Sequence, residues 1–214
     1  MKKWMMILAT CLLVACTTET YDSGDGSYSY LRADFAEMHT NGAKQVDYAV
    51  SDADRHITFA RPFTVGWATS PDTLYRVLLY YNDQPNGAEP LAVTPVYVRS
   101  PKDKDNATNQ ATDPVGFESI WPSENGRWLN LSILVKTGQP DDEKALQQID
   151  IMSDTDEDSL LHLTLLHDQG AVPQYYTARV YVSVPLGDAV QLPLRLTMNT
   201  YDGPLTRLVD GQDR

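Results

Sequence analysis

Apolar and polar residues alternate with a period of two along most of this chain, and this pattern limits its fold more than any other feature. In the segment LRADF, Leu31, Ala33 and Phe35 fall on one face of an extended chain. Successive side chains of a β-strand point to opposite faces, so this alternation is typical of half-buried strands. The same pattern recurs at 46–50, 57–59, 75–81, 129–135, 161–165, 178–184 and 190–198. The sequence therefore predicts an all-β protein.

Two prolines and one acidic segment modify this prediction. Pro95 and Pro193 lie inside predicted strands. Because proline has no N–H to give to a ladder, we expect these strands to be edge strands or to be bulged. The segment Asp141–Ile149 is the one helix candidate, since acidic residues open it and Pro140 precedes it.

A polar stretch interrupts the strands near the middle of the chain. Residues 100–116 read SPKDKDNATNQATDPVG, a composition typical of a loop or linker. Short strands at this spacing predict barrels or sandwiches. We therefore expect one β-domain over 27–100, a linker over 101–118 and a second β-domain over 119–210.

The first residues predict an export signal that ends in a lipid anchor. Lys2 and Lys3 precede a short apolar run, as in secretory signal peptides. The run ends in Leu-Val-Ala-Cys, which resembles a bacterial lipobox. We expect cleavage after a signal peptide of residues 1–15 and acylation of Cys16, since two or more chains anchor a protein stably. The alternative is an ordinary secretory signal with an incidental cysteine.

The residues after Cys16 predict a tether and a location. Residues 16–26 are small, polar and weakly acidic, as expected of a flexible tether. Thr17 stands where some bacteria place an aspartate that retains lipoproteins at the inner membrane. We therefore expect a lipid-anchored protein of the cell envelope at the outer membrane, on its periplasmic face or on the cell surface.

The acidic composition excludes one class of partner. The chain carries 29 acidic against 17 basic residues, a formal net charge of −12. Nucleic acids attract basic surfaces, so we expect no nucleic-acid partner. The sequence has no G-x-S-x-G, H-E-x-x-H or P-loop motif, and lipidation would remove Cys16 from thiolate chemistry. We expect no cofactor, no metal and no catalytic residue.

The chain resembles the NigD-like lipoproteins of Bacteroidetes. The resemblance rests on the lipobox LVAC, the segment GDGSYSYLRADF, and the later pair RWLNLSILVKTG and LHLTLLHDQG, in that order. It implies an N-terminal OB-like barrel, a C-terminal β-sandwich and an envelope lipoprotein of undetermined biochemistry. The family name comes from an operon associated with a bacteriocin, which suggests an immunity or accessory role. The resemblance implies no catalytic residues.

The histidines and one acidic run are the candidate metal ligands. His162 and His167 are five residues apart, which puts them on opposite faces of a strand. We expect His162 at the surface and His167 hydrogen-bonded to backbone at a strand end. His39 and His56 complete the four histidines. Alternate carboxylates can converge on calcium, and the run that offers them is Asp154, Asp156 and Asp158. A solvated acidic loop is the alternative that we favour.

Aromatic residues offer a candidate ligand surface. Neighbours on a strand point to opposite faces, so one member of each adjacent tyrosine pair could be exposed. These pairs are Tyr80 with Tyr81 and Tyr175 with Tyr176. Exposed aromatics bind sugar rings or protein partners. The alternative is that tyrosines simply favour strands, and we expect Trp121 and Trp128 to fill the sandwich core.

These features predict a non-enzymatic envelope lipoprotein that acts as a binding or interaction module. The membrane is one partner, through the lipid, and a protein or a neutral glycan is the other. A bacteriocin-immunity or accessory protein is the first alternative. A glycan hydrolase ranks last, because it needs two carboxylates about 5–10 Å apart and the sequence singles out no such pair.

Overall fold

The computed structural model describes residues 31–104, 110–142, 144–155, 160–188 and 190–211. The predicted signal peptide, Cys16, the tether, Asp156 and Asp158 lie outside these ranges. Within them the structure is all-β, as predicted, and has no helix of the length and apolar character needed to cross a membrane. The strands are β1 (Leu31–Thr40), β2 (Val46–Ser51), β3 (His56–Phe63), β4 (Thr73–Asn82), β5 (Glu89–Pro95), β6 (Tyr97–Val98), β7 (Lys102–Asp103), β8 (Gly116–Pro122), β9 (Trp128–Thr137), β10 (Gln148–Thr155), β11 (Leu161–Asp168), β12 (Tyr176–Pro185), β13 (Leu194–Thr200) and β14 (Gly203–Val209).

The first five strands form a curled sheet that confirms the predicted barrel. Their order is β3-β2-β1-β4-β5, with antiparallel neighbours. The two edge strands meet through a parallel bridge between Phe59 and Ala88, so the sheet closes at this point as in the five-stranded, partly open OB barrel. Inward-facing residues of the strands, among them Met38, Leu79 and Tyr81, fill the barrel.

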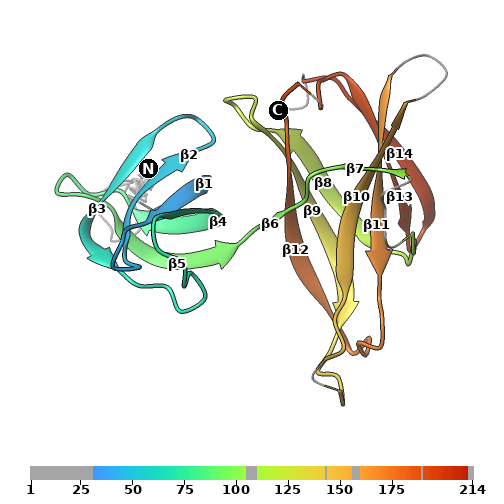
Figure 1. Ribbon diagram of the computed structural model, residues 1–214, viewed down its shortest axis with the longest axis horizontal. Coiled ribbons are helices and arrows are strands. Elements are labelled where there is room, and N and C mark those ends of the chain that lie inside the picture. The colour runs from blue at the N-terminus through green and yellow to red at the C-terminus, as the bar shows by residue number, and fades with distance from the viewer. Residues whose placement is uncertain (1–30, 105–109, 143, 156–159, 189, 212–214) are drawn as a thin grey trace, which may run out of the picture.

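The other nine strands form the predicted sandwich. One sheet has the order β14-β13-β11-β10-β7 and the other has the order β6-β12-β9-β8. The two sheets face each other across a core of aliphatic side chains such as Leu131, Leu163 and Leu196, none of them exposed (Figure 1). The alternation read from the sequence therefore identifies the core faces of β9, β11, β12 and β13.

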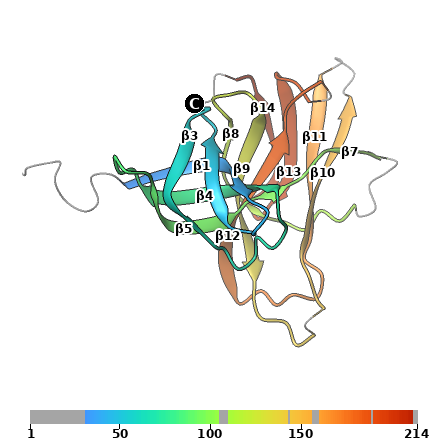
Figure 2. The same ribbon diagram turned by 60° about the vertical axis from the view of Figure 1, so that its left-hand side comes forward.

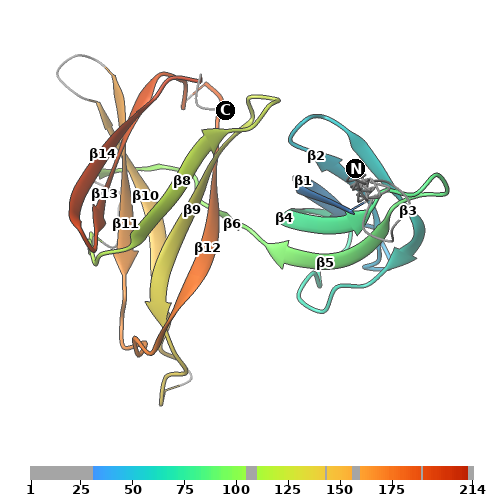
Figure 3. The same cartoon turned by 180° about the vertical axis from the view of Figure 1, so that it is seen from behind.

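The middle of the chain joins both sheets of the sandwich. Tyr97 and Val98 pair with β12, whereas Lys102 and Asp103 pair with β10. The chain thus leaves the barrel at β5 and crosses from one sheet to the other before β8, as the reverse view shows (Figure 3). Part of the stretch expected to be a linker is accordingly built into the sandwich.

The helix expected over Asp141–Ile149 is absent from the described part of that segment. Turns occupy its start, and β10 begins at Gln148. The Asp142 carboxylate accepts a hydrogen bond from the Lys144 amide, which favours a turn over a helix. Leu146 is 70% exposed, so a helix here would have had little apolar surface to bury.

The proline prediction is confirmed for Pro95 and wrong for Pro193, since β13 is an inner strand, between β14 and β11, and does not include Pro193. Pro95 ends β5, which is an edge strand of the barrel sheet and pairs with β4 across a register shift at Tyr80 and Tyr81. Pro193 lies just before β13, so that strand starts at Leu194 rather than at Val190. The missing N–H explains both positions.

Candidate functional site

The barrel and the sandwich are joined by a buried polar network centred on Arg76. Arg76 lies on the outer face of β4 and is 6% exposed. Its guanidinium donates two hydrogen bonds to the carboxylate of Asp52, at 2.6 and 2.7 Å. From the sandwich, Ser183 Oγ and Asn130 Oδ1 accept further bonds at 3.1 and 3.0 Å. Asn130 also donates to Asp52 at 3.0 Å, so each polar group here has a partner.

Aromatic rings enclose this network. The Arg76 guanidinium lies 4.8 Å from the ring centre of Trp128 and 5.6 Å from that of Phe35. Such cation–π contacts add attraction where water is excluded. A buried, bidentate charge pair fixes geometry more strongly than surface contacts do, because removing either partner leaves the other charge unpaired. We infer that these contacts hold the barrel in place against the sandwich, beside which it lies in Figure 2.

A groove lies beside this network, at the junction of the two domains. It has a volume of about 370 Å³. The barrel contributes one wall from β1 and β4, and the outer face of the four-stranded sheet contributes the other from β8, β9 and β12. The lining residues are Phe35, Leu78, Tyr80, Glu118, Ser119, Trp121, Ser132, Arg179 and Tyr181.

Four of the lining side chains are aromatic, and three of them contact one another across the domain boundary. The ring of Phe35 packs edge-to-face against Trp121 at 5.4 Å and against Tyr181 at 5.3 Å between ring centres. Tyr80 adds a further ring that is 37% exposed. Edge-to-face packing is a favoured aromatic geometry. The rings therefore hold each other in place and leave part of their surface open to the groove.

The polar side of the groove is one ion pair. Arg179 donates to both carboxylate oxygens of Glu118, at 2.5 and 2.7 Å, and Ser132 Oγ donates to the same carboxylate at 2.7 Å. These hydrogen bonds, led by those from Arg179, lower the pKa of Glu118 to about 2. Glu118 therefore stays ionised at any physiological pH. Arg179 keeps 55% of its side chain exposed, so the pair faces solvent within the groove.

The two sandwich tryptophans do not fill the sandwich core, contrary to the prediction. Trp121 lines the groove, and Trp128 stacks on Arg76 at the domain junction. The core consists of aliphatic residues from both sheets. The rings instead pack against the barrel, because a second domain covers the outer face of this sheet.

The four predicted tyrosines do not form one surface. Tyr80 lines the groove, but Tyr81 points into the barrel core and is not exposed, which corrects its assignment to a ligand surface. Its hydroxyl donates to Asp34 at 2.7 Å, and burial raises its pKa above the usual value. Tyr175, just before β12, and Tyr176, its first residue, are 80% and 61% exposed, and neither lines the groove.

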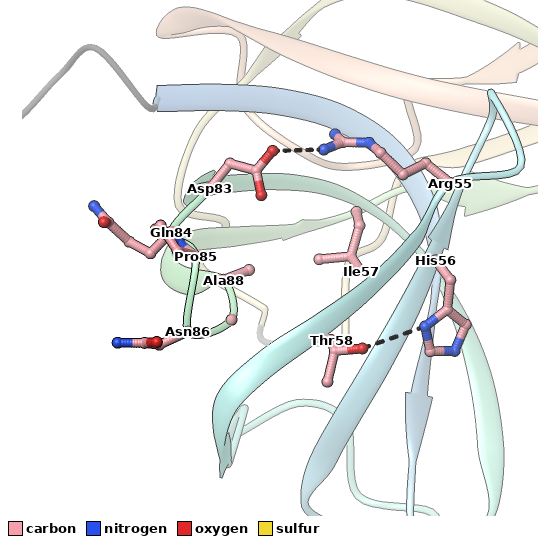
Figure 4. A pocket seen from close by; sticks show the side chains of 10 residues that line it. Arg55, His56, Ile57, Thr58, Asp83, Gln84, Pro85, Asn86 and Ala88 are labelled. Atoms are coloured by element: carbon pink, nitrogen blue, oxygen red, sulfur yellow. Dashed lines mark hydrogen bonds and ion pairs between the residues drawn. The ribbon is translucent and has the colours of Figure 1, made fainter.

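A second hollow lies at one end of the barrel, between the start of β3 and the β4–β5 turn (Figure 4). Its volume is about 450 Å³. Arg55 spans its upper side and donates to Asp83 at 2.9 Å and to Asp34 at 2.6 Å. The charged groups of this hollow are thus paired with each other, and its lining contains no Phe, Tyr or Trp ring. The interdomain groove is the stronger candidate.

The histidines are placed as the sequence predicts. His162 accepts or donates a hydrogen bond at Thr197 Oγ1, whereas His167 is buried and contacts the Asp113 carbonyl at 3.2 Å. His39 and His56 stack on either side of Tyr48 on the outer barrel surface. Among the residues that the structure describes, no three His, Cys, Asp or Glu side chains gather in a way that could hold a metal ion. Asp154 is exposed at the end of β10, and the calcium prediction otherwise lies outside these residues.

The sequence reasoning missed the residues that join the domains. Arg76, Asn130 and Ser183 lie on the outer faces of β4, β9 and β12, where polar residues are also expected of a face in contact with water. The one sequence signal of a covered outer face is in β4, where Leu78 and Tyr80 share that face with Arg76. That signal could have indicated a second interface, though not its partner.

Comparisons with solved structures show what this fold resembles. A NigD-like immunity protein from Bacteroides caccae superposes with a TM-score of 0.68 at 23% identity, over 82% of this chain and 91% of that one. A toxin-related protein from Parabacteroides distasonis gives 0.63 at 16% identity, over 86% and 95%. A protein from Bacteroides fragilis, described provisionally as a lipoprotein, gives 0.55 at 11% identity, over 83% and 95%.

No protein-family model matches the chain, and neither does any curated protein sequence. The structural likeness extends over most of the chain and includes both domains. The predicted resemblance to NigD-like proteins is therefore confirmed at the level of the fold.

Proposed function

We propose that this chain is a non-enzymatic, lipid-anchored protein of the cell envelope that binds a partner in the interdomain groove. The observation that carries the proposal is the groove itself, which combines residues of both domains and is held rigid by the Arg76 network. Pre-formed concave sites with several aromatic residues and a few placed polar groups are typical ligand sites. The partner is a protein or a neutral glycan.

The chemistry of the groove supports binding rather than hydrolysis. A glycosidase needs two carboxyl groups, one of them with a raised pKa so that it can act as an acid. The lining of this groove contains a single carboxylate, Glu118, and its pKa is lowered to about 2. Glu118 is therefore neither a proton donor at neutral pH nor a member of a pair.

The anchor is supported by the sequence LVAC before and at Cys16. Lipidation would hold the groove beside a membrane. We place the protein at the outer membrane, in agreement with Thr17 after the anchor. A structural neighbour described provisionally as a lipoprotein has the same fold, which is compatible with this assignment.

The anchor is tested by comparing the natural protein with a Cys16→Ser variant in its host. The natural protein should fractionate with membranes and carry acyl chains on its N-terminal cysteine in mass spectra. The Cys16→Ser variant should lose both properties. An unacylated natural protein that is free in the medium would refute the anchor.

The groove is tested by site-specific crosslinking in intact cells. A photoreactive amino acid replaces Tyr80, which lines the groove, and in a matched strain it replaces Tyr175, which is exposed elsewhere. We expect a discrete adduct from position 80 and none from position 175. Equal labelling from both positions, or no adduct from position 80, would contradict a binding role for the groove.

An immunity role is the second candidate, because two proteins with this fold are described as an immunity protein and as toxin-related. A deletion strain exposed to culture supernatant from related strains should then lose viability relative to its parent. Unchanged survival against every supernatant would remove this candidate.

A further inference from the structure

We propose that the interdomain groove binds a neutral saccharide, with Tyr80 and Arg179 as the main contacts. This inference rests on the proposed binding function and specifies its ligand. Three properties of the groove favour a saccharide over a protein: its size, its charge and the kinds of side chain that it presents.

The size of the groove suits a small ligand. Pockets for small molecules measure about 300–1,000 Å³, and this groove has a volume of about 370 Å³. A stable protein–protein contact instead buries about 1,200–2,000 Å² of surface and needs an extended complementary face. The groove is therefore large enough for one or two sugar rings and small for a folded partner.

The charge of the groove favours an uncharged ligand over a charged one. Glu118 and Arg179 are its only charged lining residues, and they neutralise each other through two hydrogen bonds. A cationic peptide finds no unpaired carboxylate there. A polyanion is disfavoured by the formal net charge of −12 on the chain.

The side chains match the two kinds of surface on a sugar. A pyranose ring has an apolar face of C–H groups and a rim of hydroxyls that both donate and accept hydrogen bonds. The partly exposed ring of Tyr80 can cover the apolar face, as aromatic side chains do at mixed surfaces. Arg179 has N–H donors beyond the two that Glu118 accepts, and its exposed edge can bind hydroxyls.

The rigidity of the groove also favours the binding of a neutral saccharide. The Phe35 ring contacts both Trp121 and Tyr181, and the Arg76 network fixes the two walls of the groove. A ligand that binds a pre-formed site does not have to order it, so the modest contacts of a neutral sugar are enough for measurable binding.

The experiment uses the lipidated mature protein in a sugar-free detergent. The probes are short cello-, manno-, xylo- and malto-oligosaccharides, with oligogalacturonate as an anionic control of similar size. Binding is followed by tryptophan fluorescence, since Trp121 lines the groove, and by saturation-transfer NMR. We expect at least one neutral series to bind and oligogalacturonate not to bind.

Matched variants locate the bound sugar. Tyr80→Ala removes the groove ring, and Tyr175→Ala removes an exposed tyrosine elsewhere, so neither is expected to unfold the protein. Tyr80→Ala should weaken binding about tenfold, whereas Tyr175→Ala should leave it unchanged. Arg179→Gln is a second groove variant, and thermal melting verifies that all three are folded.

The outcomes separate this inference from the proposed function. The inference is overturned if no neutral probe binds, if oligogalacturonate binds as well as the neutral probes, or if Tyr80→Ala and Arg179→Gln bind like the natural protein. Should crosslinking from position 80 then still give a protein adduct, the binding function stands and its ligand is a protein. Failure of both experiments overturns the function as well.

Discussion

Arg76 shows how one side chain can decide the arrangement of two domains. It is a charged residue in the middle of a strand, and it is almost fully buried. Burial of an unpaired charge costs several kcal/mol, so the residue is tolerated only because Asp52, Asn130 and Ser183 surround its guanidinium. Two of these three partners come from the other domain.

Replacing Arg76 with methionine should therefore destabilise the protein by about 3–5 kcal/mol, because Asp52 loses its positively charged partner and stays largely buried. The measurement is the free energy of unfolding in urea. Arg127→Ala is the control, since Arg127 pairs with Glu37 and Asp54 at the edge of the same junction and has 48% of its side chain exposed. It should cost less than about 1 kcal/mol. Equal losses in the two variants would refute a special role for Arg76.

Glu118 gives a prediction about pH. Its pKa lies at about 2 rather than 4.5, so the folded protein holds this carboxylate more strongly ionised than the unfolded chain does. The stability that the ionised Glu118 carboxylate contributes is complete above pH 4.5 and is lost as the pH falls towards 2. Arg179→Ala should raise the pKa towards 4.5, which NMR titration of the Glu118 carboxyl carbon would detect. A pKa near 4.5 in the natural protein would contradict the paired geometry.

At the scale of elements, strands could be located from the sequence because each buries one face. Alternation identified β4, β9, β11 and β12 with their core-facing residues. In β1 it located the strand but chose the wrong face, because Ala36 and Met38 fill the barrel core whereas Phe35 packs on the sandwich. The segment before β10 was predicted wrongly as a helix, because an acidic start after a proline is shared by helices and turns. What distinguishes a turn from a helix here is that Leu146 has no surface to pack on, and that is a property of the tertiary structure.

The barrel closure depends on one glycine of the β4–β5 turn. Gly87 has a φ of +113°, and an added Cβ would lie 2.7 Å from the backbone nitrogen of Ala60. Gly87→Ala should cost about 1–3 kcal/mol and weaken the contact of β3 with Ala88. Hydrogen exchange should report this as faster loss of the Ala60 amide proton, which is bonded to the Ala88 carbonyl at 3.1 Å. Gly66→Ala, with nothing within 4 Å of the added Cβ, should have little effect on this amide.

At the scale of the whole molecule, the barrel and the sandwich should behave as one unit. The outer face of β1 and β4 packs on β8, β9 and β12, with buried polar groups at its centre and aromatic rings around them. A buried charge pair at the centre couples the domains more strongly than exposed polar contacts between independent domains would. Because this packing fixes the two domains relative to each other, it also fixes the shape of the groove between them.

Calorimetry tests this coupling. The natural protein should unfold in a single transition whose calorimetric and van't Hoff enthalpies agree, because neither domain can unfold without exposing the Arg76 network. In Arg76→Met the domains should uncouple, and the ratio of the two enthalpies should rise above one. Two separate transitions in the natural protein would show that the domains are independent.

The sequence by itself determined the all-β class, the barrel followed by a sandwich, and the opposite faces taken by His162 and His167. The all-β class and the faces of the two histidines follow from local periodicity, since each strand must bury one face whatever its partner is. The order of barrel and sandwich was instead implied by the resemblance to NigD-like proteins. Only the tertiary structure decided that Trp121 and Tyr80 share a groove, that Tyr81 is buried and that Arg76 joins two domains. Outer strand faces look alike in sequence whether water or a neighbouring domain covers them, so the site between the domains exists only once they pack together.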